Sequence, residues 1–145
     1  MRVILDTNVY VSYLLVRNRR RKVTDVVEAC LTDSKIELLV PQEIIDEISR
    51  VVVEKDYLRA RIPQESQEGL LSALREATTI LVSRLEYDPI SRDRDDDFLL
   101  AHGLAEAVDL IVTGDDDLLS LGRVGPIGIV SVAQFWTSLF FSQGD

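Results

Sequence analysis

Cysteine and histidine are almost absent from this sequence, which contains one of each, Cys30 and His102. A single cysteine cannot form a disulfide within the chain, and one cysteine with one histidine leaves too few ligands for a dedicated zinc site. We therefore expect a protein of a reducing, cytoplasmic compartment. A metal ion, if there is one, has to be held by oxygen ligands.

Basic residues are also outnumbered, with 16 lysines and arginines against 25 aspartates and glutamates and a formal net charge of -9. Such a chain is not expected to hold nucleic acid by broad neutralisation of phosphates, so a nucleic-acid partner has to be bound locally. No apolar run is long enough to span a bilayer. The first residues contain no basic region followed by a long apolar stretch, so we expect neither a membrane anchor nor a signal peptide.

The length of 145 residues and the hydrophobic content of 46% suit a single domain over residues 1–145 with a sizeable core. Short apolar runs typical of buried strands alternate with segments that are apolar at helical spacing. The predicted strands are 3–5, 36–40, 79–82, 110–113 and, as a fifth candidate, 128–132. The predicted helices are 8–16, 22–31, 42–53, 64–77, 95–108 and 133–140. This alternation indicates an α/β fold, a three-layer α/β/α sandwich around a mainly parallel sheet of four to five strands.

Acidic residues follow two of the predicted strands directly. Asp6 ends the first strand, and Asp115 follows strand 110–113 across one glycine, with Asp116 and Asp117 behind it. In open α/β sheets, ligands bind beyond the carboxyl ends of the strands. Asp6 and Asp115 are therefore expected to share the functional edge of the sheet, with Asp117 as a supporting or surface acid and Asp116 in solvent.

Two helices add further acids. Asp95, Asp96 and Asp97 stand immediately before an apolar helical pattern, where one aspartate suffices to cap the helix and three adjacent carboxylates repel one another. In helix 42–53, Glu47 lies just outside the apolar arc at 100° per residue, whereas Asp46 points into solvent. Glu43, one turn before Glu47, is a reserve candidate.

Four carboxylates that converge in one cleft require protonation or a cation. Magnesium and manganese are the natural counter-ions, because they prefer oxygen ligands, and carboxylates with no histidine or thiolate nearby match that preference. A divalent ion also supports hydrolysis of a phosphodiester bond.

Four stretches of the chain together resemble the PIN domain family, and more narrowly its branch of toxin components of toxin–antitoxin pairs. They are LDTNV at 5–9, PQEIIDEI at 41–48, RDRDDD at 92–97 and VTGDDDLL at 112–119. Each is weak alone, but their order and spacing are specific as a set. The resemblance extends from Asp6 to near Ile129.

The resemblance implies an endoribonuclease that uses Mg²⁺ or Mn²⁺ to cut single-stranded or looped RNA, with a cognate antitoxin as a protein partner and homodimerisation as a further expectation. It implies that Asp6, Glu47, Asp96 and Asp115 are the catalytic acids, that Asp97 is an alternative metal ligand to Asp96, and that Asn8 and Thr113 orient the acids. Two departures concern the third stretch. Arg94 stands where this branch commonly has proline, and the triple aspartate makes Asp97 nearly as good a match as Asp96.

Other features allow two interpretations each. We expect one basic run either to contact RNA phosphates or to be an exposed charged loop between two helices, and an acidic partner is a further candidate for contact with it; the run is formed by Arg17, Arg19, Arg20, Arg21 and Lys22. Trp136 stacks on a base or docks a C-terminal helix on the core, and docking is the commoner role. His102 lies inside an apolar helix, where a structural role is far commoner than a catalytic one.

Two other functions remain open at this stage. One is a catalytically silent regulatory or scaffold PIN domain, against which the presence of all four acids counts. The other is a phosphatase that forms an aspartyl-phosphate on Asp6. Such enzymes usually have a second aspartate two residues on, where this chain has Asn8.

Overall fold

The computed structural model describes residues 1–16, 21–82 and 97–141, with only the backbone described at Asp97. Its strands are β1 (Arg2–Leu5), β2 (Glu37–Pro41), β3 (Thr79–Leu81), β4 (Leu110–Val112), β5 (Arg123–Val124) and β6 (Ile127–Val130). Its helices are α1 (Thr7–Leu15), α2 (Lys22–Thr32), α3 (Gln42–Glu54), α4 (Asp56–Arg61), α5 (Gln64–Ala77), α6 (Asp97–Ala105), α7 (Asp116–Leu119) and α8 (Val132–Phe140). Among the described residues, no helix is long and apolar enough to cross a membrane.

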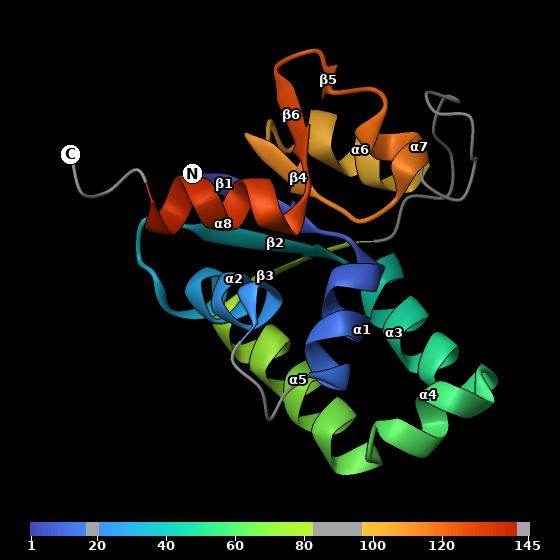
Figure 1. The fold of residues 1–145 in the computed structure, drawn as a ribbon. Coiled ribbons are helices and arrows are strands. Elements are labelled where there is room, and N and C mark those ends of the chain that lie inside the picture. Colours follow the sequence, from blue (N-terminus) through green and yellow to red (C-terminus); the bar gives the residue numbers. More distant parts are fainter. Residues whose placement is uncertain (17–20, 83–96, 142–145) are drawn as a thin grey trace.

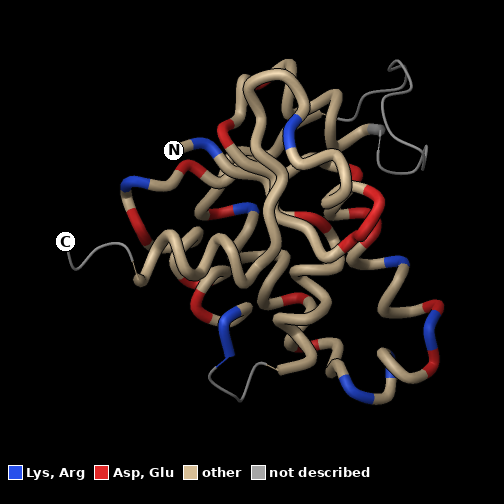
Figure 2. The backbone as a smooth tube through the Cα atoms, turned by 45° about the horizontal axis from the view of Figure 1, so that its top comes forward, with Lys and Arg blue, Asp and Glu red and all other residues tan. Residues whose placement is uncertain are grey.

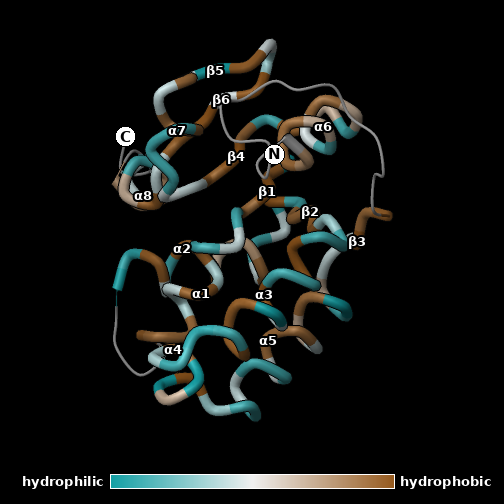
Figure 3. The backbone as a smooth tube through the Cα atoms, turned by 90° about the vertical axis from the view of Figure 1, so that its right-hand side faces the viewer, coloured by the Kyte–Doolittle hydropathy of each residue, from teal (hydrophilic) through white to brown (hydrophobic). Residues whose placement is uncertain are grey.

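The strands form one sheet in the order β3-β2-β1-β4-β6-β5, and every neighbouring pair is parallel except β5 with β6. Figure 1 shows α6 on one side of this sheet and α1, α2, α3 and α5 on the other, and α8 packs on α2. The helices alternate hydrophobic and hydrophilic segments along their length (Figure 3), as expected for helices with one buried face. The predicted α/β fold with a mainly parallel sheet is confirmed.

The predicted number of strands was too low, because the described sheet contains six and the prediction gave four to five. The additional strand, β5, pairs antiparallel with β6 through a two-residue turn at Gly125 and Pro126. Gly125 has a positive φ of 55°, a conformation that residues with a Cβ rarely adopt. A strand of two residues shows no periodicity, so no sequence pattern indicated it.

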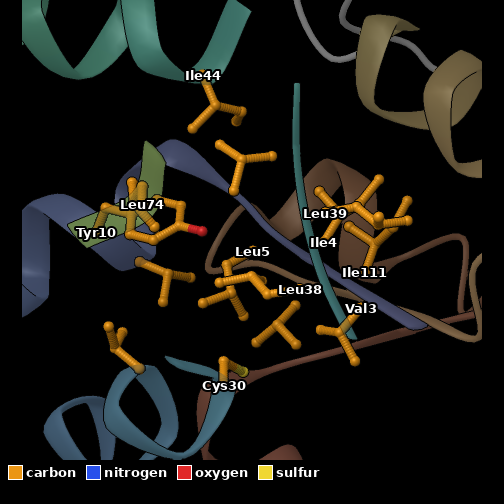
Figure 4. Close-up of a cluster of buried hydrophobic side chains, with 14 of the residues drawn as sticks. Val3, Ile4, Leu5, Tyr10, Cys30, Leu38, Leu39, Ile44, Leu74 and Ile111 are labelled. Carbon is orange, nitrogen blue, oxygen red and sulfur yellow. The ribbon is translucent and has the colours of Figure 1, made fainter. Parts of the chain in front are cut away.

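β1 lies at the centre of the sheet and is buried on both faces, as its continuous apolar run predicted. Ile4 lies beside Ile111 of β4 in the register, and the three side chains Ile4, Leu39 and Ile111 gather on one face in Figure 4. Val3 and Leu5 point to the opposite face, and all three apolar residues of β1 are at most 1% exposed. Burial on both faces is typical of a parallel strand covered by helices on each side.

The boundary between α3 and α4 was not expected from the sequence. α3 ends at Glu54, Lys55 has an extended backbone with φ of -99° and ψ of 113°, and α4 starts at Asp56. A one-residue interruption and a helix of six residues are too short for a clear periodic pattern. This break determines the direction in which the residues after Lys55 leave α3.

The carboxyl ends of β1, β2 and β4 meet at one edge of the sheet because these strands are parallel neighbours. At this edge the backbone N–H of Asp6 donates to Val112 O at 2.9 Å, and that of Thr113 donates to Val130 O at 3.0 Å. Each of β1, β2 and β4 is followed within a few residues by a helix, α1, α3 or α7. The segments that carry Asp6, Glu47 and Asp115 therefore start from a common edge.

Candidate active site

Three carboxylates line one pocket at the carboxyl edge of the sheet. The pocket has a volume of about 390 Å³, and Asp6, Glu47 and Asp115 lie in its wall together with Thr7 and Asn8. Asp6 comes from the end of β1, Glu47 from the second turn of α3 and Asp115 from the residue before α7. The structure thus brings together three of the four acids that the sequence indicated.

Asp6 is the most buried of these acids, with 6% of its surface exposed. It caps α1, and its Oδ1 accepts a hydrogen bond of 2.7 Å from the backbone N–H of Thr7. Its Oδ2 accepts one of 2.7 Å from the Thr113 hydroxyl and one of 3.3 Å from the Asn8 amide. Both oxygens are therefore held by donors, and the carboxylate has one fixed orientation.

Thr113 connects Asp6 to the segment that carries Asp115. Its side chain is fully buried, and its hydroxyl donates to Asp6 Oδ2 while it accepts the backbone N–H of Asp115 at 3.0 Å. Asn8 makes a second connection, because its Oδ1 accepts the backbone N–H of Gly114 at 3.1 Å. The turns after β1 and β4 are thus joined by side-chain hydrogen bonds that end on Asp6.

Asp115 caps the short helix α7, where its Oδ1 accepts the backbone N–H of Asp117 at 2.8 Å. Its side chain is half-buried and lines the pocket. Asp117 is also half-buried, and Asp116 is exposed to solvent. The capping bond uses only one oxygen, so Asp115 Oδ2 has capacity to accept from a further group.

Glu47 is half-buried and is connected to Asp6 through Thr7. The Thr7 hydroxyl donates to Glu47 Oε2 at 2.7 Å, and the Thr7 backbone N–H donates to Asp6. Thr7 therefore fixes two of the pocket acids relative to each other. The sequence reasoning missed this role, although the position of Thr7 directly after Asp6 was a signal that could have indicated it.

Glu43, the reserve candidate, does not line the pocket in the described structure. Its carboxylate lies 2.9 Å and 3.2 Å from His102 Nε2, which joins the first turn of α3 to α6. His102 is 2% exposed. The pair connects two helices that the chain separates by 59 residues, and this gives both side chains a structural role.

Several predicted residues lie outside the described part of the chain. Asp95 and Asp96 lie outside it, as do Arg17, Arg19 and Arg20, and of Asp97, which starts α6, only the backbone is described. Of the basic run, Arg21 is exposed, and the Lys22 ammonium lies 4.8 Å from the ring centroid of Trp136. Among the residues whose side chains are described, no group of three or more His, Cys, Asp or Glu could hold a metal ion.

Comparison with known proteins decides the family. The sequence model of the PIN domain family matches residues 2–117, which is most of the chain and includes Asp6, Glu47 and Asp115. The chain belongs to the PIN domain family. No curated protein sequence gives a significant match.

Two solved structures support the same fold at low sequence identity. A chain in the crystal structure of VapBC2 from Rickettsia felis bound to a DNA fragment from their promoter is 13% identical, with a TM-score of 0.59 over 90% of this chain and 98% of that one. The PIN domain of human SMG5 is 13% identical, with a TM-score of 0.51 over 96% of this chain and 99% of that one. The resemblance to a PIN domain seen in the sequence is therefore confirmed.

Burial shapes the electrostatics of this PIN domain's pocket. The pKa of Asp6 is raised above its ordinary value of 3.8, mainly because burial disfavours the charged carboxylate, and the negative charge of Asp115 raises it further. Hydrogen bonds from Thr113, the Thr7 backbone and Asn8 act in the opposite direction. The donors thus only partly offset the cost of the buried charge, and a cation in the pocket would favour the charged form.

Replacement of Thr113 by valine is expected to destabilise the PIN domain. Valine has nearly the same shape but lacks the hydroxyl, so Asp6 Oδ2 loses its short donor and the Asp115 N–H loses its acceptor. Loss of a buried hydrogen bond to a charged group costs about 1.5–3 kcal/mol. Urea unfolding at neutral pH with EDTA measures the loss, and Thr113→Ser, which keeps the hydroxyl, should lose less. A Thr113→Val protein as stable as the parent would contradict the role of this bond.

The raised pKa of Asp6 predicts a pH dependence of stability in the metal-free protein. Because the folded protein binds this proton more tightly than the unfolded chain, the stabilisation from a protonated Asp6 is present below pH 3.8 and is lost as the pH rises through the folded pKa. The difference in unfolding free energy, Asp6→Asn minus parent, should therefore increase as the pH rises from 3.8 through the folded pKa of Asp6. Above that pKa the difference should level off. Urea unfolding over a pH series, with EDTA present, measures the difference.

The matched control for this pH series is Asp116→Asn, which removes an exposed carboxylate in the same part of the molecule. Its unfolding free energy relative to the parent should change little over the window. If the Asp6→Asn and Asp116→Asn series run parallel to each other, Asp6 does not have the expected proton affinity.

Proposed function

We propose that the chain is a Mg²⁺- or Mn²⁺-dependent endoribonuclease that hydrolyses RNA phosphodiester bonds in the Asp6 pocket. One observation carries this proposal: carboxylates from three separate segments of a PIN domain line a single pocket, and Thr7 and Thr113 link them through hydrogen bonds. Such an arrangement is suited to binding a divalent cation and a phosphate together. The PIN domain family and the four acidic motifs agree with it.

The donor set of the pocket fits magnesium. Its described walls contain carboxylate, amide and hydroxyl oxygens and neither a histidine nor a cysteine. Magnesium is usually bound through one or two carboxylates, with waters and substrate phosphate completing the coordination, so Asp6 and Asp115 suffice as direct ligands. We propose Asp96, with Asp97 as the alternative, as a further ligand.

The protein's own groups have distinct roles in this proposal. Magnesium bound there supplies positive charge for a phosphate in transit and lowers the pKa of water. Asp6 and Asp115 hold the cation, and Thr113 and Asn8 keep Asp6 in its orientation. Glu47, fixed by the Thr7 hydroxyl, either binds the cation or accepts a proton from the attacking water.

The similarity to a chain of VapBC2 supports a narrower proposal, that this nuclease is the toxin of a toxin–antitoxin pair with a cognate antitoxin protein as its partner. At 13% identity the similarity concerns the fold alone. A shared fold is a weak guide to biological role. Co-purification with a protein encoded beside its gene, and growth arrest on expression without that protein, would test the toxin assignment separately from nuclease activity.

Removal of a pocket carboxylate is expected to abolish RNA cleavage. Asp6→Asn and Asp115→Asn each remove a proposed ligand, and Glu47→Gln removes the proposed proton acceptor, so each should lower the cleavage rate by on the order of 100-fold or more. The measurement is cleavage of single-stranded and structured RNA with Mn²⁺. Asp116→Asn, with its exposed side chain, should retain the parent's rate. A parent that cleaves none of these RNAs would instead favour a silent regulatory or scaffold PIN domain.

Metal binding should also be visible without any substrate. A ligand that binds only the folded state at 100 times its Kd stabilises it by about 2.7 kcal/mol, so Mn²⁺ or Mg²⁺ should raise the melting temperature of the parent. EDTA should reverse the increase. Asp6→Asn and Asp115→Asn should show little or no increase, because a ligand is missing. Equal stabilisation of the parent and both variants by Mn²⁺ would place the cation elsewhere.

A further inference from the structure

The pocket extends beyond the carboxylates into a second part that the proposed chemistry does not use. This part, which we name the α1–α4 arm, is lined by Val11, Ser12, Leu15, Val51, Lys55 and Tyr57. The first three belong to α1, Val51 belongs to α3, Lys55 lies at the break after α3, and Tyr57 belongs to α4. The arm thus contains apolar side chains, one aromatic ring and one ammonium group.

Helical spacing explains why the arm is continuous with the carboxylates. Thr7, Val11 and Leu15 follow one another at intervals of four on α1, and Glu47, Val51 and Lys55 do the same along α3 and its end. Side chains four residues apart share one face of a helix. Because α1 packs against α3, their two faces form opposite walls that run away from the acids.

Lys55 lies about two helical turns beyond Glu47 along this wall. At about 1.5 Å per residue, the eight residues from Glu47 to Lys55 correspond to about 12 Å along the helix axis. Lys55 is exposed, and its ammonium makes no ion pair or hydrogen bond with another described residue. Its ammonium is therefore available to an anionic group of a bound molecule.

Tyr57 provides the second contact. Its side chain is 55% exposed although it lines the pocket, so one part of the ring is open to a ligand. Val11, Leu15 and Val51 supply apolar surface in the same arm, and Leu15 is itself 38% exposed. An aromatic ring beside apolar walls and a cation is the combination that binds the base and the phosphate of a single-stranded nucleic acid.

We propose that the α1–α4 arm binds one unpaired nucleotide next to the scissile phosphate, with its base on Tyr57 and its phosphate on Lys55. This inference rests on the proposed function, because the phosphate at the carboxylates is assumed to be that of RNA. A base in a duplex is stacked and paired inside the helix, so its face does not reach the Tyr57 ring. The Tyr57 and Lys55 contacts would therefore contribute to the preference for single-stranded or looped RNA that the resemblance to PIN domains implies.

The proposal is tested by measuring whether substitutions in the arm change KM while leaving kcat unchanged. Tyr57→Ala should raise KM for a single-stranded RNA of mixed sequence by about 5- to 150-fold, the effect of losing one base stack. The kcat should stay within about twofold, because this contact is made equally in the ground state and the transition state. Tyr57→Phe keeps the ring and should restore the parent's KM. The same RNA as a duplex should be cut more slowly than the single strand by the parent.

Lys55→Gln should also raise KM, and it should reduce the slope of log affinity against log salt by about 0.7, as expected for one phosphate contact to a single strand. Lys55→Arg should preserve both. The matched controls are Lys35→Gln, the same change at the turn before β2, and Phe141→Ala, which removes an aromatic side chain that is 70% exposed after α8. Neither control residue lines the pocket, so both variants should behave as the parent.

These experiments distinguish an error in the proposed nuclease activity from an error in the proposed nucleotide binding by the α1–α4 arm. If the parent cleaves RNA but Tyr57→Ala and Lys55→Gln keep its KM, or if the duplex is cut as fast as the single strand, the arm proposal is wrong and the nuclease stands. If the parent cleaves no RNA, fluorescence anisotropy with the same labelled single strand and Mn²⁺ decides. Weaker binding by the two arm variants than by the two controls supports the arm, and equal or undetectable binding by all five proteins overturns it.

Discussion

The buried carboxylate of Asp6 is the constraint on which the rest of the site depends. A charge with so little exposure is unfavourable unless donors surround it, and the chain supplies these from both sides: the Thr7 N–H and the Asn8 amide from the start of α1, and the Thr113 hydroxyl from the end of β4. These bonds hold two turns together that are 107 residues apart in sequence. The geometry of the pocket is therefore a consequence of satisfying one ionisable group at the carboxyl end of the central strand.

The same network explains why the acids are held on rigid elements. Asp6 and Asp115 are both helix caps, so each has one oxygen bound by a backbone N–H. Glu47 lies in a helix whose first turn is joined to α6 by Glu43 and His102, and its own carboxylate accepts from Thr7. Mutual repulsion of the three carboxylates and the burial of Asp6 disfavour three negative charges in one pocket. The supporting hydrogen bonds keep the carboxylates in place even in the absence of a cation.

The fold and the site differ in how much of them the sequence could predict. β1 and β4 were predictable because a parallel strand buried on both faces gives a continuous apolar run, and the acids after them follow from the rule that strand ends form ligand sites. Glu47 followed from its angle on α3.

Glu43 was different, since its bond to His102 depends on how α3 and α6 pack, and no local pattern contains that information. Lys55 and Tyr57 were missed for a related reason: α4 is too short to show periodicity, so the break that places them in the pocket wall was not expected.

The two ends of the pocket, carboxylates at one and an ammonium with an aromatic ring at the other, would allow an acidic protein to bind RNA as proposed. With a net charge of -9 and with lysines and arginines scattered over separate elements (Figure 2), the described surface offers no broad attraction for phosphates. At one end of the pocket, the proposed binding of a phosphate would require a cation held by Asp6 and Asp115. At the other, the proposed α1–α4 arm needs only one ammonium, because most of the binding free energy would come from contact between a base and the Tyr57 ring. Stacking is less sensitive to salt than phosphate contacts are and is possible only for an unpaired base. Low positive charge would therefore suppress non-specific binding to duplexes while leaving single strands as ligands.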